Sequence, residues 1–390
     1  MKKTFFILLS LLLGLLLVVC DRDEITTTDE EQYIKTIYEY QPPVNLNDGL
    51  DVSDLNSEGL DDASIRIMID SINVGTYGLF HGLLIFRNNN LVFEEYFDGW
   101  KQQDLHPMWS VTKSISSAVI GLAIEQGKIS GVNESVFNLF SGFTQVNWTT
   151  EHKQITLEHY LTMSAGYLWN DSDNSVPSSD PNNSYLQMIN SDDWIKYVLE
   201  LPLETFPGEK FKYNNGTSTL FSVIVSDAVE NNFDNYTDTN LLSKIDIANH
   251  SWAYMAGGYP GTAGNDGGIF LTARDMSKFG LLYLNNGQWK GKQVINESWV
   301  QNSISPHIQI LKNNNLHFDY GYQWWINERV KDKNMTEIAV PYATGRGGQY
   351  IFLINDYDMM VVIISPHYNP NSSTLKIFEM IEKYILSAIM

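Results

Sequence analysis

Two pairs of strand-like segments stand near opposite ends of this chain, and they constrain its fold more than any other feature. Residues 82–97 read GLLIFRNNNLVFEEYF, two apolar runs joined at Asn88 to Asn90, and residues 348–365 repeat the arrangement around NDYD. Apolar runs separated by a short polar turn predict β-hairpins. The predicted sheet is therefore built from segments that are far apart in the sequence.

Helical patterns fill most of the remaining sequence. Residues 61–74 and 373–390 have amphipathic helical spacing, and residues 112–249 combine helical patterns with polar loops and contain no long strand-like run. A chain of this kind is expected to form an α/β (α+β) domain, an antiparallel sheet flanked by helices, with an inserted helical lobe. We expect the domain to span 58–390, with its α/β part at about 58–111 and 250–390 and the lobe at about 112–249.

The composition restricts the class of protein. The 390 residues are 43% hydrophobic and 13% aromatic, enough to fill a sizeable core and to exclude global disorder. The formal net charge is −21, from 25 Lys and Arg against 46 Asp and Glu. A field of this sign repels phosphate backbones, so nucleic acid is not expected as a partner.

The N-terminal segment indicates export. Residues 1–20, MKKTFFILLSLLLGLLLVVC, place two lysines before an apolar run that ends at Cys20, the only cysteine of the chain. This layout is typical of a secretory signal peptide and resembles a bacterial lipobox, although Val19 stands where Gly, Ala or Ser is usual. An uncleaved signal anchor is the alternative. Both interpretations predict a membrane tether, continued by a polar segment over 21–57, and a body facing the periplasm without internal disulfides.

A candidate nucleophile begins the helical pattern of residues 108–127, MWSVTKSISSAVIGLAIEQG. Ser110 and Lys113 are one helical turn apart, so both side chains are expected on one face, where the lysine is placed to accept the serine proton. The alternative is an N-cap serine followed by a surface lysine. Ser373 and Lys376 form a second S-x-x-K, which we interpret as a helix cap.

Two further motifs follow the first one. Tyr213 and Asn215 form a Y-x-N just before an apolar helical run, and Arg346-Gly347-Gly348 leads into a strand that begins near Gln349. Tyr213 has a second interpretation as a buried core tyrosine. Another Y-x-N, at residues 283 and 285, is better explained by an amphipathic helix that ends near a glycine.

This order of motifs resembles the serine β-lactamase and penicillin-binding-protein superfamily. The stretches YLTMSAGYLW, GGIFLTARDMSKFGLLYLNNGQW and YGYQWWI are similar to its class C-like branch, which includes esterases, D-aminopeptidases and 6-aminohexanoate-dimer hydrolases. The resemblance runs from about Gly82 to the C-terminus. It implies an ester- or amide-cleaving serine hydrolase that acts through an acyl-enzyme.

The resemblance also implies roles for individual residues. Ser110 attacks the carbonyl, Lys113 and Tyr213 share the proton transfers, and Asn215 holds the site by hydrogen bonding. The backbone N–H groups of Ser110 and Gln349 form the oxyanion hole. Gly347 and Gly348 let substrate approach the strand edge, and Arg346 is either a ligand for a substrate carboxylate or an exposed arginine.

Some alternatives stay open at this stage. The usual Lys-Thr-Gly is missing, which favours an esterase or amidase over efficient β-lactam hydrolysis. A D-amino-acid peptidase, a weak β-lactamase and a non-catalytic sensor of cell-wall peptides are the alternatives, and loops such as residues 169–193 are expected to set the substrate. The eight histidines are dispersed without a clustered spacing, so the sequence predicts no metal, and we expect no cofactor.

Overall fold

The computed structural model describes residues 38–143, 146–171, 179–312, 317–366 and 373–390. Cys20 and the rest of the expected signal segment lie outside this part of the chain. Tyr38–Met390 forms one compact unit. No helix within the described ranges has the length and apolar character needed to cross a bilayer.

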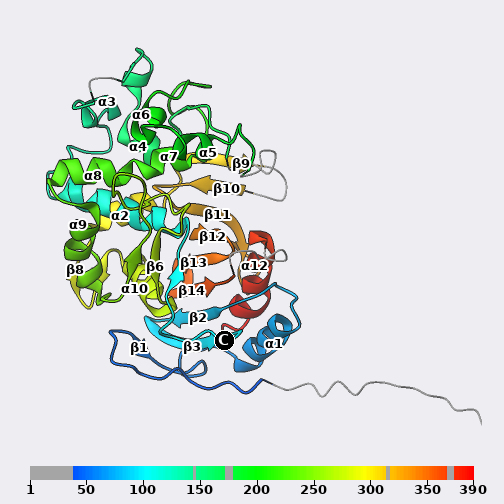
Figure 1. The fold of residues 1–390 in the computed structure, drawn as a ribbon. Helices are drawn as coiled ribbons and strands as arrows, with labels where there is room; N and C mark the ends of the chain where they lie inside the picture. Colours follow the sequence, from blue (N-terminus) through cyan, green and yellow to red (C-terminus); the bar gives the residue numbers. More distant parts are fainter. Residues whose placement is uncertain (1–37, 144–145, 172–178, 313–316, 367–372) are drawn as a thin grey trace, which may run out of the picture. The chain divides into compact units, whose positions relative to one another are not determined.

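A large twisted sheet forms the body of this unit (Figure 1). In the described ranges it has nine strands in the order β1-β3-β2-β14-β13-β12-β11-β10-β9. Only β1 and β3 pair in parallel; all the other neighbours are antiparallel. The strands are β1 (Asp51–Val52), β2 (Gly82–Arg87), β3 (Asn90–Tyr96), β9 (Ile308–Lys312), β10 (His317–Tyr320), β11 (Trp325–Lys331), β12 (Glu337–Gly345), β13 (Gln349–Ile354) and β14 (Met359–Ile364). The predicted fold class is confirmed.

Both predicted hairpins form, and they lie side by side because β2 pairs with β14. The turn between β2 and β3 places Asn88 and Asn89 at positive φ, 50° and 67°, a conformation that asparagine tolerates better than most residues. Strands from the two ends of the domain thus pair with each other inside the sheet. The described ranges also contain two smaller sheets. One consists of β4 (His106–Pro107), β6 (Ile269–Leu271) and β5 (Ser251–Trp252). The other consists of β7 (Gln288–Trp289) and β8 (Lys292–Gln293).

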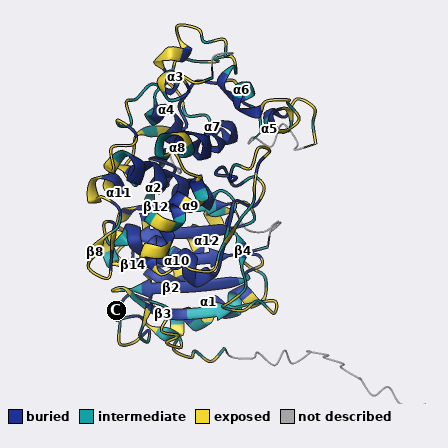
Figure 2. Ribbon diagram, turned by 60° about the vertical axis from the view of Figure 1, so that its left-hand side comes forward, coloured by how far each residue is buried: buried dark blue, intermediate teal, exposed yellow. Residues whose placement is uncertain are grey.

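The central strands are buried on both faces, which explains their continuous apolar runs. In β14, Met360, Val362 and Ile364 belong to one core cluster, and the alternate residues 359, 361 and 363 belong to the other. Successive side chains of a strand point to opposite faces, so MMVVII serves two cores at once. The buried colour extends through the strands in Figure 2.

Helices cover both faces of the sheet. On one face lie α1 (Asp62–Asn73) and α12 (Thr374–Met380), which is extended by a π-helical segment, η4 (Ile381–Leu386). On the other face α10 (Ala273–Leu284) packs against β2, β13 and β14, and α2 (Val111–Glu125) packs against β12 and β13. Residues 111–123 of α2 are all buried, because this helix also packs against α8, α9 and α11.

The segment expected to be helical contains helices joined by loops, and its described part has no β-strand beyond two isolated bridges, Ser135–Thr156 and Tyr167–Leu203. Its elements after α2 are α3 (Val136–Leu139), η1 (His152–Gln154), α4 (Leu157–Leu161), α5 (Ser184–Ile189), α6 (Trp194–Leu199), α7 (Asn215–Thr219), α8 (Phe221–Val229), α9 (Phe233–Asn240) and η2 (Leu242–Ile245). Two more elements, α11 (Glu297–Ser303) and η3 (Asn355–Tyr357), lie later in the chain.

Part of the segment expected as a tether is packed onto the domain. The compact unit begins at Tyr38, ahead of the expected boundary at residue 58. Tyr40 donates a hydrogen bond to the Val92 carbonyl at 2.7 Å, and Leu50 and Leu55 are buried. These aromatic and apolar side chains are separated by polar residues. The polar composition of the segment as a whole therefore predicted a tether and not a packed segment.

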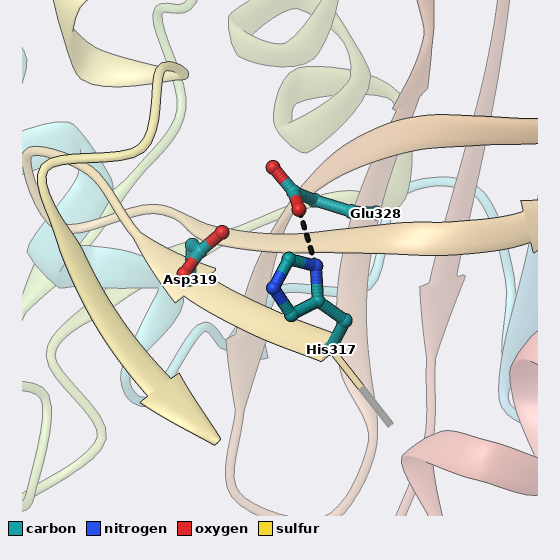
Figure 3. Close-up of side chains that lie close together, drawn as sticks. All are labelled: His317, Asp319 and Glu328. Carbon is teal, nitrogen blue, oxygen red and sulfur yellow. Dashed lines mark ion pairs between the residues drawn. The ribbon is translucent and has the colours of Figure 1, made fainter. Parts of the chain in front are cut away.

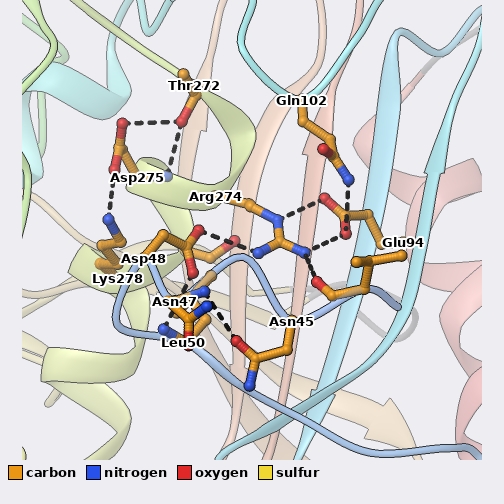
Figure 4. A network of polar contacts seen from close by, with 12 residues as sticks. Asn45, Asn47, Asp48, Leu50, Glu94, Gln102, Thr272, Arg274, Asp275 and Lys278 are labelled. Carbon is orange, nitrogen blue, oxygen red and sulfur yellow. Dashed lines mark hydrogen bonds and ion pairs between the residues drawn. The ribbon is translucent and has the colours of Figure 1, made fainter. Parts of the chain in front are cut away.

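A buried arginine fixes this segment to the sheet and to α10 (Figure 4). Arg274 of α10 donates to both carboxylate oxygens of Glu94 on β3, at 2.8 and 2.6 Å, and to Asp48 at 3.0 Å. It also donates to the Val44 carbonyl at 2.9 Å. Arg274 and Glu94 are each only 3% exposed, so the pair holds three separate parts of the chain together without water.

Candidate active site

Ser110 stands at the N-cap of α2 but does not cap it. The backbone of Ser110 is helical (φ −68°, ψ −7°), and its hydroxyl makes no capping hydrogen bond. The serine of the second S-x-x-K differs from Ser110 in both respects. Ser373 has extended backbone, and its hydroxyl accepts a hydrogen bond from the Lys376 N–H. Ser373 is therefore a cap, as the sequence indicated, whereas the hydroxyl of Ser110 is left for another partner.

That partner is the Lys113 ammonium or amine group. Lys113 is 1% exposed, and its Nζ lies 3.0 Å from Ser110 Oγ and 2.7 Å from Asn215 Oδ1. It also donates to the Ala263 carbonyl in a short hydrogen bond. The Asn215 and Ala263 oxygens thus hold Nζ at hydrogen-bonding distance from the serine hydroxyl.

Burial favours the unprotonated form of Lys113 at neutral pH. Desolvation lowers the pKa of Lys113 to about 7, and the nearby Asp171 carboxylate opposes part of this effect by favouring the charged form. Asn215 connects the two groups, since its Nδ2 donates to Asp171 Oδ2 at 2.6 Å while its Oδ1 accepts from Lys113. A large fraction of Lys113 is therefore unprotonated at pH 7 and can accept a proton.

The ring of Tyr213 also lies next to the Lys113 side chain. Lys113 Nζ is 4.9 Å from the centroid of the Tyr213 ring, and that ring stacks on Trp325 of β11 with centroids 5.8 Å apart. Burial raises the pKa of Tyr213 well above its usual value, although a hydrogen bond with the Ser110 side chain acts in the opposite direction. The phenol thus stays protonated at neutral pH.

The backbone before Ser110 is tightly constrained. Trp109 has φ of 48°, an uncommon value for a large side chain, and its N–H donates to the Gly267 carbonyl at 2.9 Å. Gly264, with φ of 76°, lies directly against this turn, where a Cβ would come within 2.0 Å of the Trp109 carbonyl oxygen. Only glycine fits there, so the loop over residues 260–268 determines how Ser110 is presented.

The glycine-containing hairpin expected to border the site meets the same turn. A Cβ on Gly345, at the end of β12, would lie 2.4 Å from the Met108 carbonyl oxygen, so the two backbones are in close contact. Gly347 and Gly348 follow with φ of 87° and 103°. Gln349 begins β13, and Arg346 between the strands is exposed.

The Gln349 side chain is buried and holds the hairpin in place. Its Nε2 donates to the carbonyls of Arg346 and Ser365 at 3.1 and 3.0 Å, and its Oε1 accepts from the Ser365 N–H at 3.0 Å. The side chain of Gln349 is thus committed to structure. The predicted oxyanion hole uses only the backbone N–H of Gln349, and the contacts of its side chain do not involve that group.

The structure brings together four of the predicted residues and adds others. Ser110, Lys113, Tyr213 and Asn215 form one contact network. Sequence reasoning missed Asp171, the Ala263 carbonyl and Gly264. The glycine-rich stretch GGYPGTAGNDGG was a signal for the Gly264 turn, whereas nothing local distinguished Asp171 from the other acidic residues of its loop.

The other Y-x-N lies in the core. Tyr283 is buried near the end of α10, and Asn285 is the C-cap residue of that helix, followed by Gly287 at φ 83°. The helical interpretation of this second motif is confirmed.

An antiparallel sheet covered by helices, with a serine and a buried lysine at the start of an inner helix, defines a serine hydrolase. The Beta-lactamase family matches residues 78–379, and the chain belongs to that family. The chain is 22% identical over 306 residues to a 6-aminohexanoate-dimer hydrolase of Paenarthrobacter ureafaciens, covering 74% of this chain and 73% of the relative.

Solved structures share the fold. A Bacillus anthracis protein described provisionally as a 6-aminohexanoate-dimer hydrolase superimposes with a TM-score of 0.64 at 21% identity, covering 79% of each chain. An octameric penicillin-binding protein homologue from Pyrococcus abyssi gives a TM-score of 0.60 at 16% identity, over 84% of this chain and 79% of that one. The predicted superfamily and the prediction of an enzyme are both confirmed.

Proposed function

We propose that this enzyme cleaves an ester or amide bond through an acyl-enzyme on Ser110. One observation carries the proposal: a fully buried lysine with a pKa of about 7 lies 3.0 Å from the hydroxyl of a serine that caps nothing. A serine hydroxyl becomes a strong nucleophile only when a neighbouring base takes its proton.

In the proposed first step, unprotonated Lys113 takes the proton of Ser110 while Oγ attacks the substrate carbonyl carbon. The resulting tetrahedral intermediate collapses by breaking the ester or amide bond. The Tyr213 hydroxyl donates a proton to the leaving oxygen or nitrogen and regains one from protonated Lys113. Water then hydrolyses the acyl-enzyme, with the same groups acting in reverse.

The oxyanion is proposed to bind the backbone N–H groups of Ser110 and Gln349. The Ser110 N–H has no backbone acceptor within the described ranges and lies at the N-terminus of α2, where the helix dipole favours negative charge. The contact between Gly345 and the chain at Met108 supports the closeness of Gln349 to this site. Arg346 is exposed at the same hairpin, which supports contact with a substrate carboxylate.

We also propose that the domain acts outside the cytoplasm, tethered in the periplasm through its N-terminus. The support is the sequence of residues 1–20, with Cys20 as the proposed lipidation site. Labelling cells with a fatty-acid analogue and comparing the wild type with Cys20→Ala tests this proposal. Label on the wild type alone supports a lipid anchor, and label on neither protein refutes it.

The catalytic proposal is tested by intact mass after exposure to a fluorophosphonate, with turnover of p-nitrophenyl butyrate measured in parallel. The reagent forms a bond from serine Oγ to phosphorus with loss of fluoride. We expect one adduct on the wild type and none on Ser110→Ala. Ser373→Ala is the matched control from the second S-x-x-K and should label and turn over like the wild type. A folded wild type without adduct or turnover would favour a binding or sensor protein instead.

A further inference from the structure

A histidine and two carboxylates meet at the edge of the main sheet, away from the Ser110 network (Figure 3). His317 and Asp319 are two residues apart on β10 and therefore point to the same face, and Glu328 reaches that face from the neighbouring strand β11. One potential ligand atom from each lies within 4.8 Å of the others. His317 Nδ1 is already paired with Glu328.

The three side chains are sheltered and carry metal-binding atoms. Asp319 is 5% exposed, and the side chains of His317 and Glu328 are 14% and 31% exposed. Ligand atoms about 2.0–2.2 Å from a tetrahedral zinc ion lie about 3.3–3.6 Å from one another, so the three side chains must move closer together by about an ångström to share one ion. One imidazole and two carboxylates form a donor set that suits zinc.

We propose that His317, Asp319 and Glu328 bind one divalent transition-metal ion, with Zn²⁺ as the best fit. Two carboxylates and a neutral imidazole hold a net charge of −2, which a dication neutralises. The overall charge of −21 further raises the local concentration of cations.

Gln309 of β9 supplies the outer contact that metal-bound histidines usually have. Its side-chain amide lies 3.1 Å from His317 Nε2. When Nδ1 binds the ion, Nδ1 carries no proton and Nε2 carries one. The Nε2–H then donates a hydrogen bond to Gln309 Oε1, once the Gln309 amide has made a half-turn about its last side-chain bond. Such a contact fixes the tautomer and orientation of the ring.

The ion would join β10 to β11 and, through Gln309, to the edge strand β9. On the opposite face of the same strands, Tyr320 packs against Trp325, with ring centroids 5.1 Å apart, and Trp325 stacks on Tyr213. Binding to the folded state alone stabilises it by mass action. Zinc is therefore expected to raise the melting temperature without taking part in the reaction at Ser110.

The test uses the full chain without an affinity tag, purified in a mild detergent and freed of metal by chelator and dialysis. Titration calorimetry with Zn²⁺ and the visible absorption of added Co²⁺ report binding directly, and the melting temperature reports its effect on the fold. We expect one ion per chain. The variants His317→Ala and Glu328→Gln should each weaken binding more than about tenfold.

His250→Ala is the matched control, because His250 pairs with a single carboxylate, Asp238, at 2.7 Å. This variant should bind zinc like the wild type. The proposal is overturned by the absence of stoichiometric binding to the wild type, or by unchanged affinity in both His317→Ala and Glu328→Gln. The Glu328 variant keeps the test valid if the histidine variant folds poorly, since the glutamate side chain is partly exposed.

Discussion

The rate of catalysis should depend on pH through the protonation of Lys113. In the proposed mechanism Lys113 must be unprotonated to accept the Ser110 proton, and burial lowers the pKa of Lys113 to about 7. At pH 6 only about one tenth of such a group is unprotonated, and at pH 5 about one hundredth. We therefore expect kcat/KM to be nearly constant above pH 8, to fall about tenfold at pH 6 and about a hundredfold at pH 5.

Asp171→Asn tests the cause of this profile. The carboxylate favours protonated Lys113, so its removal should lower the lysine pKa further and extend activity to lower pH. One amide, that of Asn215, bridges the two groups, which places the charges roughly 6–7 Å apart, where Coulomb's law with an effective dielectric constant near 20 gives about 2.5 kcal/mol. The acid limb should therefore move down by about two pH units.

The assay is kcat/KM for p-nitrophenyl butyrate from pH 5 to 9, followed at the isosbestic wavelength of p-nitrophenol, with circular dichroism to verify folding at each pH. Lys113→Arg and Lys113→Ala should be inactive throughout, because a guanidinium does not deprotonate and alanine has no base. A wild-type profile that stays flat from pH 5 to 8, or an acid limb that moves upward in Asp171→Asn, would refute the role of Lys113 as the base.

Three further outcomes follow from single contacts. Tyr213→Phe should reduce kcat by about 10²–10⁴ with an unchanged melting temperature, measured by ester turnover and calorimetry. Tyr283→Phe, from the second Y-x-N, should keep its kcat. Gly264→Ala should lower kcat by about 10² or more in the same assay, because its Cβ would displace the Trp109 carbonyl and with it the nucleophile. Arg274→Met should reduce the free energy of unfolding by about 3–5 kcal/mol in urea titrations, since it leaves Glu94 buried without its cation.

Two control variants separate these effects from general damage. A Cβ on Gly261, in the same loop as Gly264, would lie 3.4 Å from the Ala253 carbonyl oxygen, so Gly261→Ala should be tolerated. Arg66 forms an ion pair within α1 and its side chain is 41% exposed, so Arg66→Met should cost less than about 1 kcal/mol. Equal losses in control and test variants would contradict the specific contacts proposed here.

Much of the fold was predictable because its signals are local. The β2–β3 and β13–β14 hairpins, the helices α1 and α12 and the helical middle of the chain follow from periodicity and turn residues. The pairing of β2 with β14 did not follow, since no local pattern specifies which distant strand lies alongside. The packed part of the expected tether was also missed, because its few buried side chains are spread among polar ones.

The sequence by itself determined the superfamily, the helical register that puts Ser110 beside Lys113, and the motif order that leads to Tyr213 and Asn215. The tertiary structure decided what those residues do, because a pKa depends on the dielectric and charges around a group rather than on its neighbours in the chain. It buried Lys113, placed Asp171 behind Asn215 and brought His317 and Asp319 to Glu328. In the last cluster only His317 and Asp319 share a short spacing in the sequence; Glu328 joins them only when β10 pairs with β11.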